Sequence, residues 1–314
     1  MAEYEKGLVS VVIPTYKRSD LLKKAIDSVL HQTYQKIQLL VVNDNPIGDV
    51  YSQALYALLS KYDDPRLRLV EQEKHINGAA ARNAGIRQAT GEYIAFQDDD
   101  DYWEPDKIER QVRLLSSLDA SWGAVSCLAR TYKNGELTLC ALPYRSGEIL
   151  MDVLTCQTSL ETGAELIRRS ALDESGYFDE HLKRHQDLQL FARLTEKYKV
   201  QLDPVYLHNR ETKDGRNRPS ADQLREIKQA YFSSIRDILD RLSTKDRERV
   251  YIMHDFECAC VLIRNGQSKE GLRKFLGVCR TPRTLYMAIK RIAVRMIGQK
   301  CRYMLQRRYA GKRG

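Results

Sequence analysis

Hydrophobic positions in the first hundred residues alternate between two spacings. Short apolar runs typical of buried strands lie at 8–13, 39–42, 67–70 and 93–97. Apolar residues three or four apart predict intervening helices at 20–30, 50–61 and 78–89. Ser19 or Asp20 is a suitable N-cap for the first helix. Strands alternating with helices through short connections predict an α/β fold with a mostly parallel sheet covered on both faces.

The remainder of the chain predicts an extension of this sheet followed by helices alone. Further strands are expected at 123–128, 137–142 and 200–206, and helices at 104–118 and 187–198. After residue 220 the pattern is helical, at 221–242, 246–264, 268–279 and about 284–308. Residues 216–220 (RNRPS) read as a loop, so we expect an α/β domain over 1–218 and a helical region over 219–314.

Charge is distributed unevenly along the 314 residues. The net charge of +9 combines a balance of +14 over 264–314 with −5 over the rest. The basic character therefore belongs to one segment and does not indicate a nucleic-acid-binding surface over the whole protein. Hydrophobic residues at 43% and charged residues at 30% exclude a low-complexity or wholly disordered chain.

Cysteine usage and hydropathy indicate the compartment. The seven cysteines form no CxxC pair, so neither a zinc finger nor a disulfide framework is predicted, and free thiols in a reducing cytosol are expected. The N-terminus lacks the pattern of a secretory signal, and no apolar stretch approaches the roughly 18 residues of a membrane span. We therefore expect a soluble or peripheral protein.

An acidic cluster ends the strand at 93–97. Asp98, Asp99, Asp100 and Asp101 follow it directly. Ligands of open α/β sheets bind at the carboxyl ends of strands. Carboxylates at alternate positions suit Mg²⁺ or Mn²⁺ bound together with a diphosphate. A solvated acidic loop capping the next helix is the alternative, and the cluster alone does not distinguish the two.

Other strand ends carry groups that suit a nucleotide. Residues 14–18 (PTYKR) supply an aromatic face, a hydroxyl and two cations, and Asp44 supplies a carboxylate after the second strand. Residues 77–85 (NGAAARNAG) begin a helix with small residues, whose backbone N–H groups, together with Arg82, favour an anion. Each segment alone is equally explained as a turn, a cap or a close helix contact. Together at adjacent strand ends they predict a pocket for a nucleotide, a diphosphate and a metal ion.

These motifs resemble those of the inverting family 2 glycosyltransferases, which have the GT-A fold. The resemblance covers about residues 8–210, through PTYKR, ND, ARNAGI and GEYIAFQDDDDYW. It implies that Asp44 contacts the base, commonly uracil, and that Arg82 lies near the diphosphate. It also implies that Asp98 reaches the ribose or the metal and that Asp100 binds the metal. The remaining nucleotide-binding residues expected from this region are Pro14, Thr15, Tyr16 and Arg18. NDNP replaces the commoner DDGS of the family, which weakens the assignment of the base.

The resemblance also assigns a catalytic base. Residues 175–180 (SGYFDE) are similar to the family's GGFDE segment, and Asp187 occupies the position of the carboxylate that deprotonates the acceptor hydroxyl. Gln186 replaces the usual Glu beside it, which removes a charge and should leave the pKa of Asp187 less raised. Asp187 is also suited to cap its helix, and the two roles are compatible.

Two further residues have equally strong structural alternatives. His208 resembles a histidine that approaches the metal or the diphosphate, although a lone histidine is commonly structural. Trp103 is suited to stack on an acceptor sugar, or else to pack beneath the helix at 104–118.

The basic tail is amphipathic. Leu285, Ile289, Ile292, Met296 and Tyr303 share one helical face, and basic residues lie away from it. Such a helix suits the surface of an anionic membrane, and packing on its own domain is the alternative. The family resemblance favours the membrane, because many bacterial members act on lipid-linked acceptors at the cytoplasmic face of the inner membrane.

The resulting expectation is a metal-dependent inverting glycosyltransferase with Mn²⁺ or Mg²⁺ as cofactor. It would move a hexose-type sugar from a nucleotide diphosphate, of the UDP type, to a saccharide or lipid-linked acceptor in bacterial surface-polysaccharide synthesis. A sugar-nucleotide nucleotidyltransferase is the first alternative, but PTYKR lacks the glycines that a nucleoside triphosphate loop requires. A nucleic-acid-binding protein is the second, and no nucleic-acid-binding motif is found. The sequence leaves open whether the chain forms a homo-oligomer.

Overall fold

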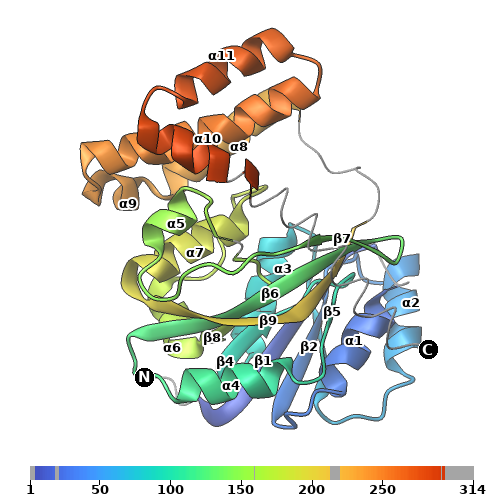
Figure 1. Ribbon diagram of the computed structural model, residues 1–314. Helices are drawn as coiled ribbons and strands as arrows, with labels where there is room; N and C mark the ends of the chain where they lie inside the picture. Colours follow the sequence, from blue (N-terminus) through green and yellow to red (C-terminus); the bar gives the residue numbers. More distant parts are fainter. Residues whose placement is uncertain (1–3, 18–20, 159, 213–219, 291, 294–314) are drawn as a thin grey trace, which may run out of the picture.

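One mixed sheet organises the computed structural model, which describes residues 4–17, 21–158, 160–212, 220–290 and 292–293 (Figure 1). The strand order is β3-β2-β1-β4-β8-β6-β9-β5, and β7 pairs with β6. Among these residues, no helix is long and apolar enough to cross a membrane.

The first half of the sheet is parallel, as predicted. Its strands are β1 (Glu5–Thr15), β2 (Ile37–Asn43), β3 (Leu67–Glu71) and β4 (Gly91–Phe96). The β1 strand pairs in parallel with both β2 and β4, and β2 pairs in parallel with β3. The helices between them are α1 (Leu22–Leu30), α2 (Val50–Leu59) and α3 (Gly78–Gln88). The residues expected to cap α1, Ser19 and Asp20, lie outside the described residues.

The second half of the sheet mixes directions. Its strands are β5 (Tyr102–Trp103), β6 (Trp122–Lys133), β7 (Glu136–Cys140), β8 (Leu166–Arg168) and β9 (Lys199–Glu211). The β8 strand is antiparallel to β4 and β6, whereas β6 and β9 are parallel. The helices are α4 (Lys107–Ser116), α5 (Leu150–Leu154), α6 (Arg169–Ser175) and α7 (Gln186–Lys197). The hydrophobic pattern did not predict β5, β8, α5 or α6, because each is too short to show a period.

Two hydrophobic cores lie against the sheet. Val9 and Val11 of β1 pack with Ile26 of α1 and Ile108 of α4, and Val12 packs with Ile86 of α3 in the other core. Neighbouring strand residues thus enter different cores, which is expected of strands buried on both faces.

The C-terminal helices gather at one end of the molecule (Figure 1). They are α8 (Ala221–Ser234), α9 (Arg236–Arg241), α10 (Thr244–Arg264) and α11 (Ser268–Val278), and residues 282–290 are also helical. The single helix predicted over 221–242 is interrupted at Ile235, whose φ of −118° is not helical. Tyr231 and Ile235 share a buried cluster with Leu154 and Ala192, so the helices pack directly on α5 and α7. The predicted boundary near 218 falls in 213–219, outside the described residues.

Candidate functional site

A cleft of about 550 Å³ lies at the carboxyl ends of β1, β2 and β4, as predicted from the strand ends. The residues that line it are Pro14, Thr15, Tyr16, Asp44, His75, Gly78, Arg82, Asp98, Asp99, Asp100, Asp101, Arg210 and Glu211. The cleft therefore brings together every described residue that the sequence assigned to nucleotide binding. Arg18, also assigned there, lies outside the described residues.

The end of the cleft near β2 carries an aromatic pair and a buried carboxylate. The rings of Tyr16 and His75 stack with centroids 3.7 Å apart and an interplanar angle of 7°. His75 Nδ1 lies 2.8 Å from Asp44 Oδ2, and Gln72 Nε2 donates to Asp44 Oδ1 at 2.8 Å. Burial raises the pKa of Asp44, although the contact with His75 opposes that shift. A flat ring and a carboxylate that accepts hydrogen bonds suit a nucleobase.

The sequence did not single out His75 or Gln72. Both lie between β3 and α3, in a segment without hydrophobic periodicity. Their proximity to Asp44 depends on β3 lying next to β2 in the sheet. Their place in the site could therefore not be predicted without knowing that β3 pairs with β2.

The opposite end of the cleft is built around the start of α3. Asn77 caps this helix, and its side chain accepts hydrogen bonds from the backbone N–H groups of Ala79 and Ala80. The cap thus occupies two of the N–H groups that the sequence assigned to an anion. Arg82 Nη2 donates to Asp98 Oδ1 at 2.5 Å. Burial alone would raise the pKa of Asp98, but the Arg82 guanidinium holds it below its usual value.

Small residues let α3 approach the sheet closely. A Cβ atom on Gly85 would lie 2.3 Å from Val12 Cγ1, far inside normal contact. Close helix packing, which was an alternative explanation of the small residues in this segment, is therefore one of their roles. It also places Arg82 over the strand end that carries the acidic cluster.

The four carboxylates of the acidic cluster differ in their protein partners. Asp99 Oδ2 accepts from Thr15 Oγ1 at 2.9 Å, and Asp101 lies 3.0 Å from His208 Nε2. Burial, with the charges of Asp98 and Asp100, raises the pKa of Asp101 to about 8. Burial is the larger cause of this shift, and the neighbouring negative charges add to it. Hard oxygen donors under mutual repulsion fit a divalent cation such as Mn²⁺ or Mg²⁺.

His208 contacts the acidic cluster but is not part of the cleft lining. Its imidazole is buried and does not line the cleft, and it lies against Asp101. A Cβ atom on Gly163 would lie 2.5 Å from its Nε2, so the ring is closely packed. Burial lowers the pKa of His208 to about 4, which favours a neutral ring. The role of His208 as a metal ligand therefore stays a prediction; in the structure its ring contacts Asp101, which lines the cleft.

Asp187 lies in the first turn of α7. Its Oδ1 accepts the backbone N–H of Leu188 at 2.8 Å. The N-cap of α7 is His185, with a left-handed φ of 61°, so Asp187 is not the cap residue. Burial raises the pKa of Asp187, the positive charge of Arg82 lowers it, and Asp98 raises it further. Asp187 is half-buried and does not line the cleft, but the charges of Arg82 and Asp98, which do line it, act on its carboxylate.

Arg210, which the sequence did not single out, adds a second cation to the cleft. Its Nη1 lies 2.7 Å from Glu161 Oε1. The negative charge of Glu161 raises its pKa, and Asp101 and Asp98 act in the same direction. The only sequence signal was its place two residues after His208 in β9.

Trp103 lies in the core. Only 3% of its surface is exposed, its Nε1 donates to the Gly163 carbonyl at 2.9 Å, and Lys107 Nζ of α4 lies 3.9 Å from the ring centre. An acceptor sugar cannot stack on a ring covered in this way. We therefore correct the expectation of acceptor stacking, and packing against α4 is the alternative that the structure supports.

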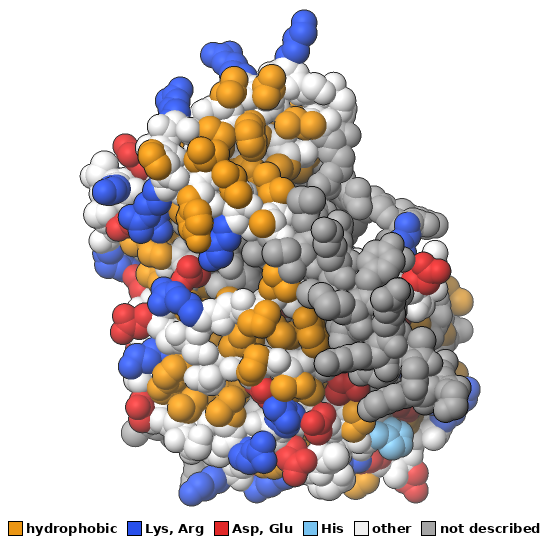
Figure 2. All heavy atoms as spheres, in the orientation of Figure 1, with side chains coloured by type: hydrophobic (Ala, Val, Ile, Leu, Met, Phe, Trp, Pro, Cys, Tyr) orange, Lys and Arg blue, Asp and Glu red, His pale blue; other side chains and the backbone are white. Residues whose placement is uncertain are grey.

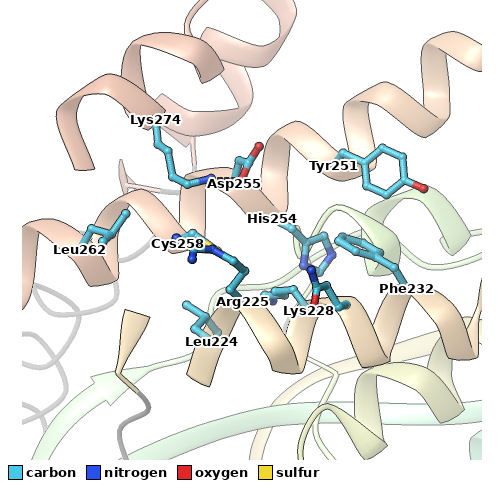
Figure 3. Close-up of a pocket in the computed structure, with 11 residues that line it drawn as sticks. Leu224, Arg225, Lys228, Phe232, Tyr251, His254, Asp255, Cys258, Leu262 and Lys274 are labelled. Carbon is cyan, nitrogen blue, oxygen red and sulfur yellow. Dashed lines mark hydrogen bonds and ion pairs between the residues drawn. The ribbon is translucent and has the colours of Figure 1, made fainter. Parts of the chain in front are cut away.

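A smaller cavity, of about 330 Å³, lies between α8, α10 and α11 (Figure 3). The ammonium of Lys274 lies 2.7 Å from Asp255 Oδ1, and that of Lys228 lies 2.7 Å from Glu257 Oε2. These cations are neutralised within the protein, which does not favour a charged ligand.

His254, which lines this cavity, belongs to a cluster of residues that could hold a metal ion. Ligand atoms of Cys156, His254 and Glu257 lie within 4.8 Å of one another. The Lys228 ammonium already pairs with Glu257, and a second cation there would be repelled. We therefore place the candidate metal site in the cleft.

Comparison with known proteins identifies the family. The sequence profile described as "Glycosyl transferase family 2" matches residues 10–176. The chain is 29% identical over 238 residues to the uncharacterized glycosyltransferase YwdF of Bacillus subtilis, covering 76% of this chain and 83% of that protein. It is 30% identical over 190 residues to the amylovoran biosynthesis glycosyltransferase AmsB of Erwinia amylovora, covering 59% and 62%.

A third relative has a named reaction. It is WfaP of Escherichia coli, a UDP-Glc:alpha-D-GlcNAc-diphosphoundecaprenol beta-1,3-glucosyltransferase. The identity is 32% over 110 residues, covering 35% of this chain and 42% of WfaP.

Solved structures share the fold. TarS (residues 1–349) of S. aureus in complex with UDP-GlcNAc aligns with a TM-score of 0.57 at 17% identity, covering 81% of this chain and 71% of that chain. The mannosyltransferase PcManGT of Pyrobaculum calidifontis, in complex with GDP-Man and Mn²⁺, aligns with a TM-score of 0.57 at 18% identity, covering 91% and 84%.

The protein is a glycosyltransferase with the GT-A fold and a helical C-terminal region. It belongs to glycosyl transferase family 2.

Proposed function

We propose that the protein is an inverting, metal-dependent glycosyltransferase. It moves a sugar from a UDP-type donor to a saccharide or lipid-linked saccharide in bacterial surface-polysaccharide synthesis. The observation that carries this proposal is the cleft that joins Tyr16 and Asp44 to Arg82 and the acidic cluster. Asp187 lies outside the cleft lining, but its carboxylate is subject to the charges of Arg82 and Asp98. The name of AmsB, an amylovoran biosynthesis glycosyltransferase, supports a role in polysaccharide synthesis. The name of WfaP, which acts on a sugar linked to diphosphoundecaprenol, supports a lipid-linked acceptor.

The residues of the cleft divide the binding of the donor between them. Tyr16 and Asp44 receive the base, and Arg82 and Arg210 face the diphosphate charge. Asp98 and Asp100 would hold the divalent cation, which when bound supplies positive charge for the departing diphosphate.

Asp187 supplies the base. Its half-buried carboxylate accepts the proton of the acceptor hydroxyl, and the oxygen attacks the anomeric carbon from the face opposite the diphosphate. The bond to the diphosphate breaks as the new glycosidic bond forms, so the configuration inverts. Burial raises the pKa of Asp187, which makes the carboxylate a stronger base than an exposed aspartate.

Ligand binding tests the donor class directly. At about 100 times Kd, UDP with Mn²⁺ should stabilise the fold by about 2.7 kcal/mol, which raises Tm by several degrees. An RNA oligomer at the same concentration should leave Tm unchanged, and GDP with Mn²⁺ should raise it less than UDP. Stabilisation by RNA alone would instead favour a nucleic-acid-binding protein.

We also propose peripheral contact between the C-terminal segment and an anionic membrane. The described part of this segment supports it, because Leu285, Ile289 and Ile292 are 38%, 54% and 42% exposed. Met287 and Ala288, on another face of this helix, are buried in a cluster with Met253 and Phe256 of α10. The predicted apolar face is therefore not the face that packs. Figure 2 shows apolar side chains gathered over the C-terminal helices, with Lys and Arg around them.

Vesicle binding tests this contact. Replacing both Leu285 and Ile289 by serine should reduce partitioning onto anionic phospholipid vesicles at least tenfold, because each apolar side chain contributes about 1.5–3 kcal/mol when buried. Tyr251→Ser, which removes an exposed aromatic side chain from α10, is the matched control and should partition normally. Co-sedimentation measures both. Equal partitioning of the double variant and the unmodified chain would refute the contact.

A further inference from the structure

A groove of about 700 Å³ lies between the β6–β7 hairpin and helix α10. Leu139 of β7 and Leu142, just after it, line the groove from the hairpin side. Phe256 and Val261 line it from α10. These four side chains are hydrocarbon, so they cannot pair with sugar hydroxyls but can cover an apolar group.

The groove and the nucleotide cleft meet at one ion pair. Glu161 lines the groove, Arg210 lines the cleft, and Arg210 Nη1 lies 2.7 Å from Glu161 Oε1. Gln157 and Thr158 also line the groove. A molecule lying along the groove can therefore place a polar end beside the cleft while its other end contacts hydrocarbon.

Basic side chains also border the groove. Arg145 and Lys290 both line it and are exposed. Arg145 is paired with Asp152, whose carboxylate lies 2.7 Å from its Nε. Asp152, Glu161 and Glu257 line the groove as well, so its charges are largely balanced within the protein and the lining does not require a charged acceptor.

We propose that this groove binds the apolar part of an amphiphilic acceptor, with the acceptor sugar at the Glu161–Arg210 end. The proposal rests on the proposed function, since it presupposes a sugar donor in the neighbouring cleft. It assigns the acceptor site jointly to the β6–β7 region and to α10, so the C-terminal helical region forms one wall of the site. Leu142 and Val261, as hydrocarbon side chains of the lining, then contact the apolar part of the acceptor.

Cysteine protection tests the groove without knowledge of the natural acceptor. Cys260 lines the groove and is partly exposed, whereas Cys279 is partly exposed and does not line it. The probes are n-octyl β-D-glucopyranoside, below its micelle concentration, and methyl β-D-glucopyranoside. Alkylation by iodoacetamide is followed at each cysteine by peptide mass spectrometry. Octyl glucoside should slow alkylation of Cys260 about fivefold or more, because the Cys260 thiol is accessible only while the groove is unoccupied. Alkylation of Cys279 should be unaffected. The methyl glucoside should have no effect.

Substitution in the groove provides the second arm. Leu142→Glu places a charge in the hydrocarbon wall and should abolish protection of Cys260 by octyl glucoside. Leu69→Glu is the matched control, because Leu69 is also partly exposed but lies on β3 at the other side of the sheet, and protection should persist. Unchanged Tm values show that both variants fold.

Each outcome decides between the two proposals. Equal protection by both glucosides, no protection by either, or protection that survives Leu142→Glu overturns the groove assignment. Stabilisation by UDP with Mn²⁺ is measured on the same samples and should be the same for Leu142→Glu and the unmodified chain. If UDP with Mn²⁺ does not stabilise the unmodified chain, the proposed function is refuted. If UDP stabilises the chain but octyl glucoside does not protect Cys260, only the assignment of the groove is refuted.

Discussion

Replacing Asp187 by asparagine is expected to abolish most sugar transfer while leaving donor binding unchanged. Asparagine has nearly the same shape, and its carbonyl oxygen can still accept the N–H of Leu188, but it cannot take a proton at neutral pH. General base catalysis contributes about 10²–10⁴-fold, so kcat should fall by that factor. Steady-state kinetics with radiolabelled donor measures kcat, and calorimetric titration with UDP measures binding.

The pH profile of this variant separates a base from a residue that only positions others. Burial raises the pKa of Asp187, so transfer by the unmodified enzyme should decline as the pH falls through that raised value and the carboxylate becomes protonated. The residual activity of Asp187→Asn should lack this decline. Asp222→Asn, on an exposed position of α8, is the control and should keep both the rate and the profile. Near-normal turnover by Asp187→Asn would remove it from the mechanism.

Replacing Asp100 by alanine is expected to remove the effect of metal on nucleotide binding. Asp100 lines the cleft together with Asp98, and its negative charge acts on neighbouring Asp101, so its carboxylate lies where a cation would offset the repulsion within the cluster. For the unmodified enzyme, removal of Mn²⁺ by a chelator should weaken UDP binding at least tenfold, or about 1.4 kcal/mol. For Asp100→Ala, the affinities with and without Mn²⁺ should be equal and close to the metal-free value.

Asp106→Ala provides the matched control for this experiment. Asp106 lies five residues after Asp101. Its carboxylate is about half exposed and does not line the cleft. Its replacement should leave the metal effect intact. An Asp100→Ala enzyme that still binds UDP more tightly with Mn²⁺ would contradict the assignment of Asp100 as a metal ligand.

The strand ends illustrate how far local sequence leads to a site. Asp44 and Asp98 could be identified because each directly follows an apolar run, and parallel strands bring such positions to one edge of a sheet. His75 and Arg210 could not, since each reaches the cleft only through the pairing of strands far apart in the chain. The burial of Trp103 and His208 could not be predicted for a related reason. Their chemistry suits a ligand, but β5 and β9 pair so that both side chains are enclosed.

The sequence by itself determined the alternating elements, the parallel half of the sheet and the acidic edge, because these depend on residue spacing within short segments. Only the tertiary structure decided that β8 inserts antiparallel between β4 and β6. It also decided which carboxylates point into the cleft, and that α10 faces the β6–β7 hairpin across a groove. Those features arise from contacts between residues distant in the chain. The spacing of residues within one short segment does not predict such contacts.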